Sequence, residues 1–162
     1  SAPGPRLPSD GGWNRKGDVA QERWDRMLLD AFRRCADFLE QYNVRIALDN
    51  HGLSTNDGDW QLSLIERVGS KRFGVNLDTG NFRTADPYGD LEKCAPYAVT
   101  VQVKTEITPK GGTKQEADLK REIDMLKRVG YRGYVTLEYE AAEDPWKAVP
   151  AWLKQMKESF AA

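Results

Sequence analysis

Four short runs rich in β-branched and apolar residues alternate with helical segments along this chain, and this alternation limits the fold more than any other feature. The runs cover residues 44–48, 73–77, 99–103 and 133–137. Each follows a segment with helical character, most clearly before the first and last runs, where apolar residues recur every three or four positions. Strands that alternate with helices form parallel βαβ units, in which each strand is buried on both faces. The chain is therefore expected to have an α/β fold.

Capping residues indicate where the expected helices begin and end. Asn43, Gly69 and Gly130 each follow a helical pattern, as helix C-caps do. Asp59 is expected to cap the second helix, and Asp144-Pro145 is typical of a helix start. The last helix is expected to extend to about residue 160, although Pro150 could end a first short turn instead. Cys35 and Cys94 lie on apolar helical faces and are expected in the core, and residues 105–116 read as a mobile loop over a site.

The number of strands, taken with the chain length, favours half of a closed barrel. An open sheet of four parallel strands has two unpaired edges, whereas a (β/α)₈ TIM barrel has none and usually needs about 250 residues. The chain has 162. We expect residues 18–162 to supply about four βα units of such a barrel and residues 1–17, rich in Pro and Gly, to form an irregular βα loop. A partner chain or an N-terminal segment would supply the other half; a small open α/β sheet is the alternative.

Composition excludes several classes of function. The 24 Lys and Arg residues nearly balance the 25 Asp and Glu residues, for a net charge of −1, which argues against nucleic-acid and anionic-membrane surfaces. No apolar run approaches the ~20 residues that a membrane span needs. Two cysteines fit a reducing compartment, so we expect a cytoplasmic protein. The single histidine excludes a metal cluster built on several histidines.

Polar residues end, or nearly end, the four expected strands. In α/β folds the carboxyl ends of parallel strands form the ligand-binding edge of the sheet. Three carboxylates and an amide converging there would repel one another unless a cation lay between them, and an all-oxygen set favours Mn²⁺ or Mg²⁺ over Zn²⁺. Simple capping of strands or helices is the alternative. The candidate metal ligands are Asp49, Asp78, Gln102 and Glu138.

Four motifs, in order, carry a resemblance to a known family. They are ALDNHG at 47–52, NLDTGN at 76–81, VQVK at 101–104 and GYRGYVTLEYE at 130–140. Together they resemble the sugar phosphate isomerase/epimerase family, the xylose-isomerase-like barrels, over about residues 31–160. The resemblance implies the C-terminal half of a (β/α)₈ barrel, strands five to eight, with one divalent metal ion. By position it places Asp49 and Gln102 where relatives commonly have Glu and His, and Asp78 and Glu138 at the usual Asp and Glu.

The resemblance also implies a chemistry, that of an isomerase or epimerase of carbohydrate metabolism acting on a sugar, keto-sugar or polyol. A metal-stabilised enediolate forms when a carboxylate removes an α-proton, and a second carboxylate returns the proton. We expect Glu138 as the base and Asp49 as its partner. Lys104 is expected to stabilise an oxyanion or bind substrate, with a solvated lysine as the alternative. His51 and Asn81 are expected to bind substrate hydroxyl groups.

Other functions remain open at this point. A dehydratase or lyase acting on a keto-sugar or cyclitol would use the same site. A non-catalytic sugar-binding half-barrel would keep the fold without the metal. DNA repair by an apurinic-site endonuclease, which shares the fold, is disfavoured because those relatives carry a histidine-rich three-zinc site and this chain has one histidine.

Overall fold

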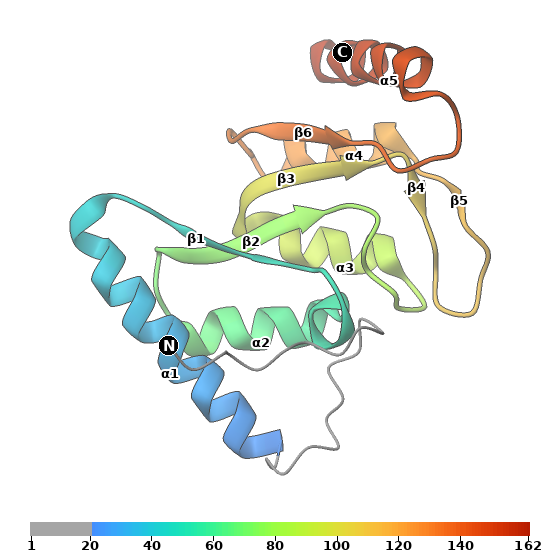
Figure 1. The fold of residues 1–162 in the computed structure, drawn as a ribbon. Helices are drawn as coiled ribbons and strands as arrows, with labels where there is room; N and C mark the ends of the chain where they lie inside the picture. Colours follow the sequence, from blue (N-terminus) through green and yellow to red (C-terminus); the bar gives the residue numbers. More distant parts are fainter. Residues whose placement is uncertain (1–20) are drawn as a thin grey trace.

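The computed structural model describes residues 21–162, which are built around a four-stranded parallel sheet (Figure 1). Its strands, in spatial order, are β1 (Ile46–Asp49), β2 (Phe73–Asp78), β3 (Ala98–Lys104) and β6 (Val135–Glu138). Each is parallel to its neighbour and follows it along the chain, which confirms the predicted βαβ units. The expected loop at residues 1–17 lies outside the described residues.

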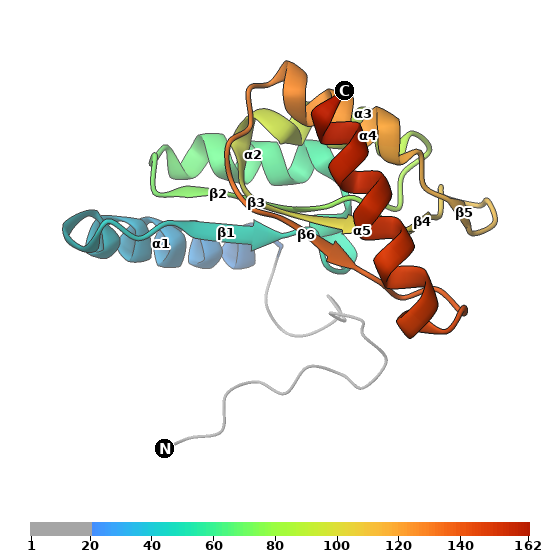
Figure 2. The ribbon, with the colours of Figure 1, turned by 90° about the horizontal axis from the view of Figure 1, so that it is seen from above.

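Within the described residues, five α-helices precede, connect and follow these strands. In chain order they are α1 (Gln21–Leu39), α2 (Gly58–Val68), α3 (Pro87–Cys94), α4 (Leu119–Arg128) and α5 (Pro145–Ala161). Short 3-10 helices follow α1, precede α2 and follow α3, at Glu40–Tyr42, Leu53–Asn56 and Ala95–Tyr97. In Figures 1 and 2, α1 lies beside the edge strand β1 and α5 beside the opposite edge strand β6.

The core lies between the sheet and its helices because alternate residues of a strand point to opposite faces. On one face, Val75, Leu77 and Val101 are fully buried, and they belong to one apolar cluster with residues of the helices, including Leu91 and Ile123. On the other face the same strands carry polar residues, among them Asn76, Asp78, Gln102 and Lys104. Apolar packing therefore fixes one face of the sheet and leaves a polar inner face.

Side-chain caps explain where the helices begin. Asp57, rather than the expected Asp59, caps α2 by accepting a hydrogen bond from the Trp60 amide at 3.0 Å. Asp144 caps α5 as predicted, and that helix continues through Pro150. Asn43, with φ of 52°, and the glycines at 69 and 130 adopt the left-handed conformation expected of helix C-caps.

Residues after β3 form a hairpin instead of the expected loop. Strands β4 (Glu106–Ile107) and β5 (Gln115–Glu116) pair antiparallel, and the Ala117 amide donates to the Thr105 carbonyl at 3.0 Å. The hairpin also contacts the loop after β2, because the Lys110 amide donates to the Thr84 carbonyl at 2.8 Å. Two neighbouring loops at the rim are thus joined through their backbones.

The burial of the two cysteines and the length of the helices complete the description of the fold. Cys94 is buried as predicted, but Cys35 is exposed, because the buried residue on that stretch of α1 is its neighbour Ala36. None of the helices within residues 21–162 combines the length and the apolar character needed to cross a bilayer.

Candidate functional site at the carboxyl rim of the sheet

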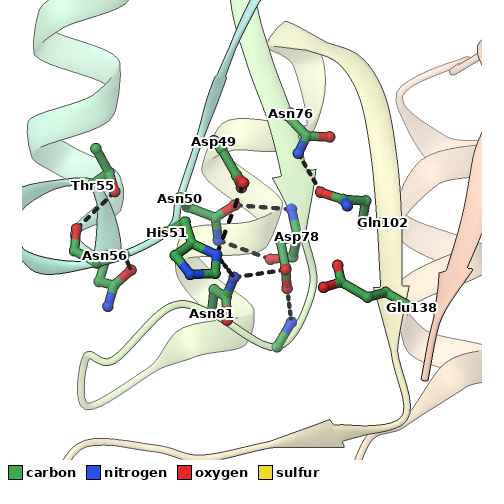
Figure 3. Close-up of polar contacts among 12 residues, drawn as sticks. Asp49, Asn50, His51, Thr55, Asn56, Asn76, Asp78, Asn81, Gln102 and Glu138 are labelled. Atoms are coloured by element: carbon green, nitrogen blue, oxygen red, sulfur yellow. Dashed lines mark hydrogen bonds and ion pairs between the residues drawn. The ribbon is translucent and has the colours of Figure 1, made fainter. Parts of the chain in front are cut away.

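The polar residues predicted from the sequence lie at one rim of the sheet (Figure 3). Asp49, Asp78 and Glu138 are the last residues of β1, β2 and β6. The strand register pairs Asp78 with Gln102 and Lys104 with Glu138 across neighbouring strands. The parallel sheet therefore brings together side chains that are far apart in the sequence.

Asp78 is the most tightly held of these groups, with an exposure of only 1%. Its Oδ1 accepts a hydrogen bond from the Gly80 amide at 2.9 Å, and its Oδ2 accepts one from Asn81 Nδ2 at 2.6 Å. Asn50, which is fully buried, bonds both the backbone amide and the carbonyl of Asp78 at 2.8 Å. Burial raises the pKa of Asp78 to about 6.

Lys104 is buried among carboxylates, which overturns the alternative of a solvated lysine. Its side chain is 7% exposed, and its Nζ lies 3.1 Å from Glu138 Oε1 and 3.5 Å from Asp78 Oδ2. It also forms an ion pair and hydrogen bond with Glu140. Burial acts to lower the pKa of Lys104, but the hydrogen bonds that it donates to Glu140 and Glu138, together with the charges of Asp78 and Glu138, outweigh burial and raise that pKa. Lys104 therefore places a positive charge among the carboxylates of the rim.

Among residues 21–162, three acceptor oxygens on the inner face of the sheet are buried without a hydrogen-bond partner. They belong to Asp49 (Oδ1), Asn76 (Oδ1) and Glu138 (Oε2), on three different strands. Burial, with the charge of Glu138 adding to it, raises the pKa of Asp49 against the opposing effect of His51. Unpartnered buried acceptors are rare because each costs about 1–3 kcal/mol, so a cluster of them points to a missing donor or cation.

His51 and Asn81 lie next to one another at the mouth of this site. His51 Nδ1 is 3.5 Å from Asn81 Nδ2 and 4.0 Å from Asp49 Oδ2, and the His51 side chain is 72% exposed. Both residues follow strand ends, on the loops after β1 and β2. They are placed where a molecule that approaches the acidic rim from solvent would meet them.

The predicted site residues did not include three residues that shape the site. Asn50 supports the Asp78 backbone, Glu140 pairs with Lys104, and Asn76 donates a hydrogen bond from Nδ2 to Gln102 Oε1. Asn76 lies two residues before Asp78 on β2, so strand alternation places both on the same face. Glu140 lies two residues after Glu138, beyond the end of β6, and would share its face only if the chain stayed extended there. That spacing was the available signal for both, whereas nothing in the sequence indicates the role of Asn50.

The donor set suits a hard divalent cation, although the side chains do not already form a coordination sphere. In the described part of the chain, no three His, Cys, Asp or Glu side chains are grouped so that they could hold a metal ion as they stand. The carboxylates of Asp78, Glu138 and Glu140, however, all pair with the single ammonium of Lys104, and Asp49 adds a fourth carboxylate at the same rim, so negative charge is in excess. This excess of carboxylate oxygens fits a dication with oxygen ligands.

Comparison with known proteins identifies the architecture. A family model described as xylose isomerase-like TIM barrel matches residues 6–156. Three similar solved structures are the apo 3-keto-D-glucoside 4-epimerase from E. coli, a D-allulose 3-epimerase from Methylomonas sp. in complex with D-allulose, and the IolI protein with a bound zinc atom. Their TM-scores are 0.68, 0.57 and 0.62, with 18%, 18% and 19% identity.

The matches cover most of this chain but only about half of each solved structure. The chain is covered over 88%, 90% and 89% of its length, but it spans only 56%, 55% and 57% of those structures. It therefore corresponds to little more than half of each. No curated protein sequence matches the chain significantly. The structural neighbours include sugar epimerases, and one of the three holds a metal ion.

Proposed function

Because the chain belongs to the xylose isomerase-like TIM-barrel family, we propose that its acidic rim is the active site of a divalent-metal-dependent sugar epimerase or isomerase. The substrate class is a sugar or keto-sugar, in line with neighbours that include a 3-keto-D-glucoside 4-epimerase and a D-allulose 3-epimerase. Asp49, Asp78, Gln102 and Glu138 would hold the ion. Mn²⁺ or Mg²⁺ suits these oxygen donors better than Zn²⁺.

One observation carries the proposal. The two carboxylates proposed as the acid/base pair each keep one buried oxygen without a hydrogen-bond partner, Glu138 Oε2 and Asp49 Oδ1. A carboxylate that must accept a substrate proton needs a free lone pair within reach of the carbon. These two groups lie on the two edge strands, β6 and β1, so they would approach a bound substrate from different sides.

Each residue then has a defined task. A divalent ion at this site would polarise the substrate carbonyl and so acidify the adjacent C–H bond. Lys104 holds Glu138 through Oε1, which leaves Oε2 to take the proton, and Asp49 returns a proton to the opposite face or to the neighbouring carbon. His51 and Asn81 bind substrate hydroxyl groups at the mouth. The Lys104 ammonium adds positive charge where the substrate oxygen becomes negative.

The proton-transfer role is tested by solvent exchange. The protein, supplied with Mn²⁺, is incubated with ketohexoses in deuterated water, and deuterium incorporation beside the carbonyl is followed by NMR. Glu138→Gln keeps the shape of the side chain and removes the base, so exchange should fall by about 10²–10⁴-fold. Glu143→Gln, at an exposed position after β6, is the matched control and should exchange like the wild type. Unchanged exchange in Glu138→Gln would remove Glu138 from the mechanism.

A further part of the proposal concerns the other half of the barrel, from an N-terminal segment or a partner chain. In the described part of the chain, β1 and β6 are unpaired edges, and the helices beside them expose large apolar side chains: Met27 and Phe38 on α1, Tyr42 on the 3-10 helix that follows α1, and Trp146, Leu153 and Phe160 on α5. Residues 21–162 supply five helices for four strands. If a second copy of this chain completed the barrel, β6 of each copy would pair with β1 of the other, and both α5 of one copy and α1 of the other would have to cover that junction. Four strands joined by three helices would close the barrel instead.

The composition of the working particle tests this part. The intact mass and subunit stoichiometry of the purified protein should show additional polypeptide that is large enough for the other four strands. This polypeptide would be either part of the same chain or a second, different chain. A particle built only from copies of residues 1–162 would contradict it.

A further inference from the structure

Asn76 occupies the centre of the polar inner face, between two of the proposed ligands. It lies on β2, in register with Asp49 on β1. On the other side it reaches β3, where its Nδ2 donates a hydrogen bond to Gln102 Oε1 (Figure 3). Its amide also favours the charged form of Asp49 and so acts to lower the pKa of that carboxyl. One amide thus touches two neighbouring strands at the level of the site.

The contact to Gln102 decides which end of that amide faces the rim. The two ends of a glutamine amide have nearly the same shape, but one accepts hydrogen bonds and the other only donates them. Beside an excess of carboxylates, a glutamine without restraint would turn its NH₂ group toward the negative charge. A cation could not bind that NH₂ group. The Asn76 donor favours the opposite orientation, in which Oε1 lies on the β2 side and keeps a second lone pair for a further partner.

We propose that Asn76 is a positioning residue for the divalent ion, because its amide holds Gln102 with the oxygen available to the ion. This inference rests on the proposed function, since it concerns the ion of that site. Asn76 is not itself a ligand in this arrangement; it acts through Gln102. Groups that orient metal ligands are typically worth 10–100-fold in metal affinity.

Titration of the purified protein with Mn²⁺, by calorimetry and by the electron paramagnetic resonance spectrum of the bound ion, tests the inference. Asn76→Ala removes the donor, and Asn76→Leu removes it while keeping the volume of the side chain. Both should weaken Mn²⁺ binding by about 10-fold or more and change the spectrum. Thr100→Ala is the matched control, because Thr100 is partly buried and is the register partner of Asn76 on β3. It should bind Mn²⁺ like the wild type.

A double-mutant cycle separates action through Gln102 from other roles. In a Gln102→Ala background, Asn76→Leu should cause no further loss of Mn²⁺ affinity. A full additional loss there would overturn the inference, as would wild-type affinity in the Asn76 single variants. In both cases the proposed function would stand, because the wild type binds the ion. If the wild type itself binds neither Mn²⁺ nor Mg²⁺, the metal part of the proposed function fails and the inference fails with it.

Discussion

Glu122 offers the most direct test of the energetics of this fold. It lies in the first turn of α4 and has no exposed surface, in a core that is otherwise largely apolar. Burial raises the pKa of Glu122 from 4.5 to about 8, and the Thr79 side chain only partly opposes that effect. At pH 7 the folded protein therefore keeps a proton on Glu122 that the unfolded chain releases.

The cost of keeping this proton follows from linkage. Each pKa unit between the folded and unfolded states is worth about 1.4 kcal/mol, and the unfolded pKa lies 2.5 units below pH 7, so the cost at pH 7 is about 3 kcal/mol. Because the folded pKa is raised, the contribution of Glu122 to stability is fully present below pH 4.5. It is lost as the pH rises toward about 8.

Glu122→Gln should remove this pH dependence, because glutamine has nearly the same shape and does not ionise. Urea unfolding at a series of pH values measures the difference in unfolding free energy between variant and wild type. The difference should be near zero at pH 4.5 and reach about 3 kcal/mol in favour of the variant at pH 7. Glu66→Gln, at an exposed position on α2, should show no such trend. A difference that does not change with pH would refute the reasoning.

Two further substitutions probe how the rim is built, each read by thermal or urea unfolding. Asn50→Ala removes two buried hydrogen bonds to the Asp78 backbone and leaves both backbone groups unpaired, so it should destabilise the protein by about 2–4 kcal/mol; a loss below about 0.5 kcal/mol would contradict this role. Gly80→Ala would bring a Cβ within 2.7 Å of the Glu106 carbonyl oxygen and 2.8 Å of Lys104 Cβ, and should cost about 1–3 kcal/mol. Gly112→Ala, whose Cβ would lie 3.4 Å from the nearest atom, should cost much less, and equal losses would argue against crowding at Gly80.

The strand pattern was predictable because each strand needs an apolar face that packs on helices. The runs at 44–48, 73–77, 99–103 and 133–137 match β1, β2, β3 and β6 closely, with small shifts at the ends. The hairpin of β4 and β5 was not predictable, since each strand has two residues and shows no periodicity. Its pairing depends on contacts with the loop after β2, which only the folded chain provides.

The location of the candidate site was predictable, but its hydrogen bonds and ion pairs were not. Strand ends place Asp49, Asp78, Gln102 and Glu138 at one rim, and the register confirms that Asp78 and Gln102 are neighbours. Whether Lys104 would point to solvent or lie among carboxylates depends on Glu140, whose direction the sequence leaves open. The prediction for Cys35 was wrong because the apolar face of α1 is wider than the part of it that is buried. A rotation of the helix by one residue therefore leaves Cys35 exposed.

The backbone hydrogen bond between Lys110 and Thr84 has a mechanical consequence for the rim. It ties the hairpin after β3 to the loop that follows Asp78, on the side where Asn81 meets the site. A molecule that pushes either segment outward must carry the other with it or break that bond. On this flank of the site the two segments are therefore expected to move together rather than separately.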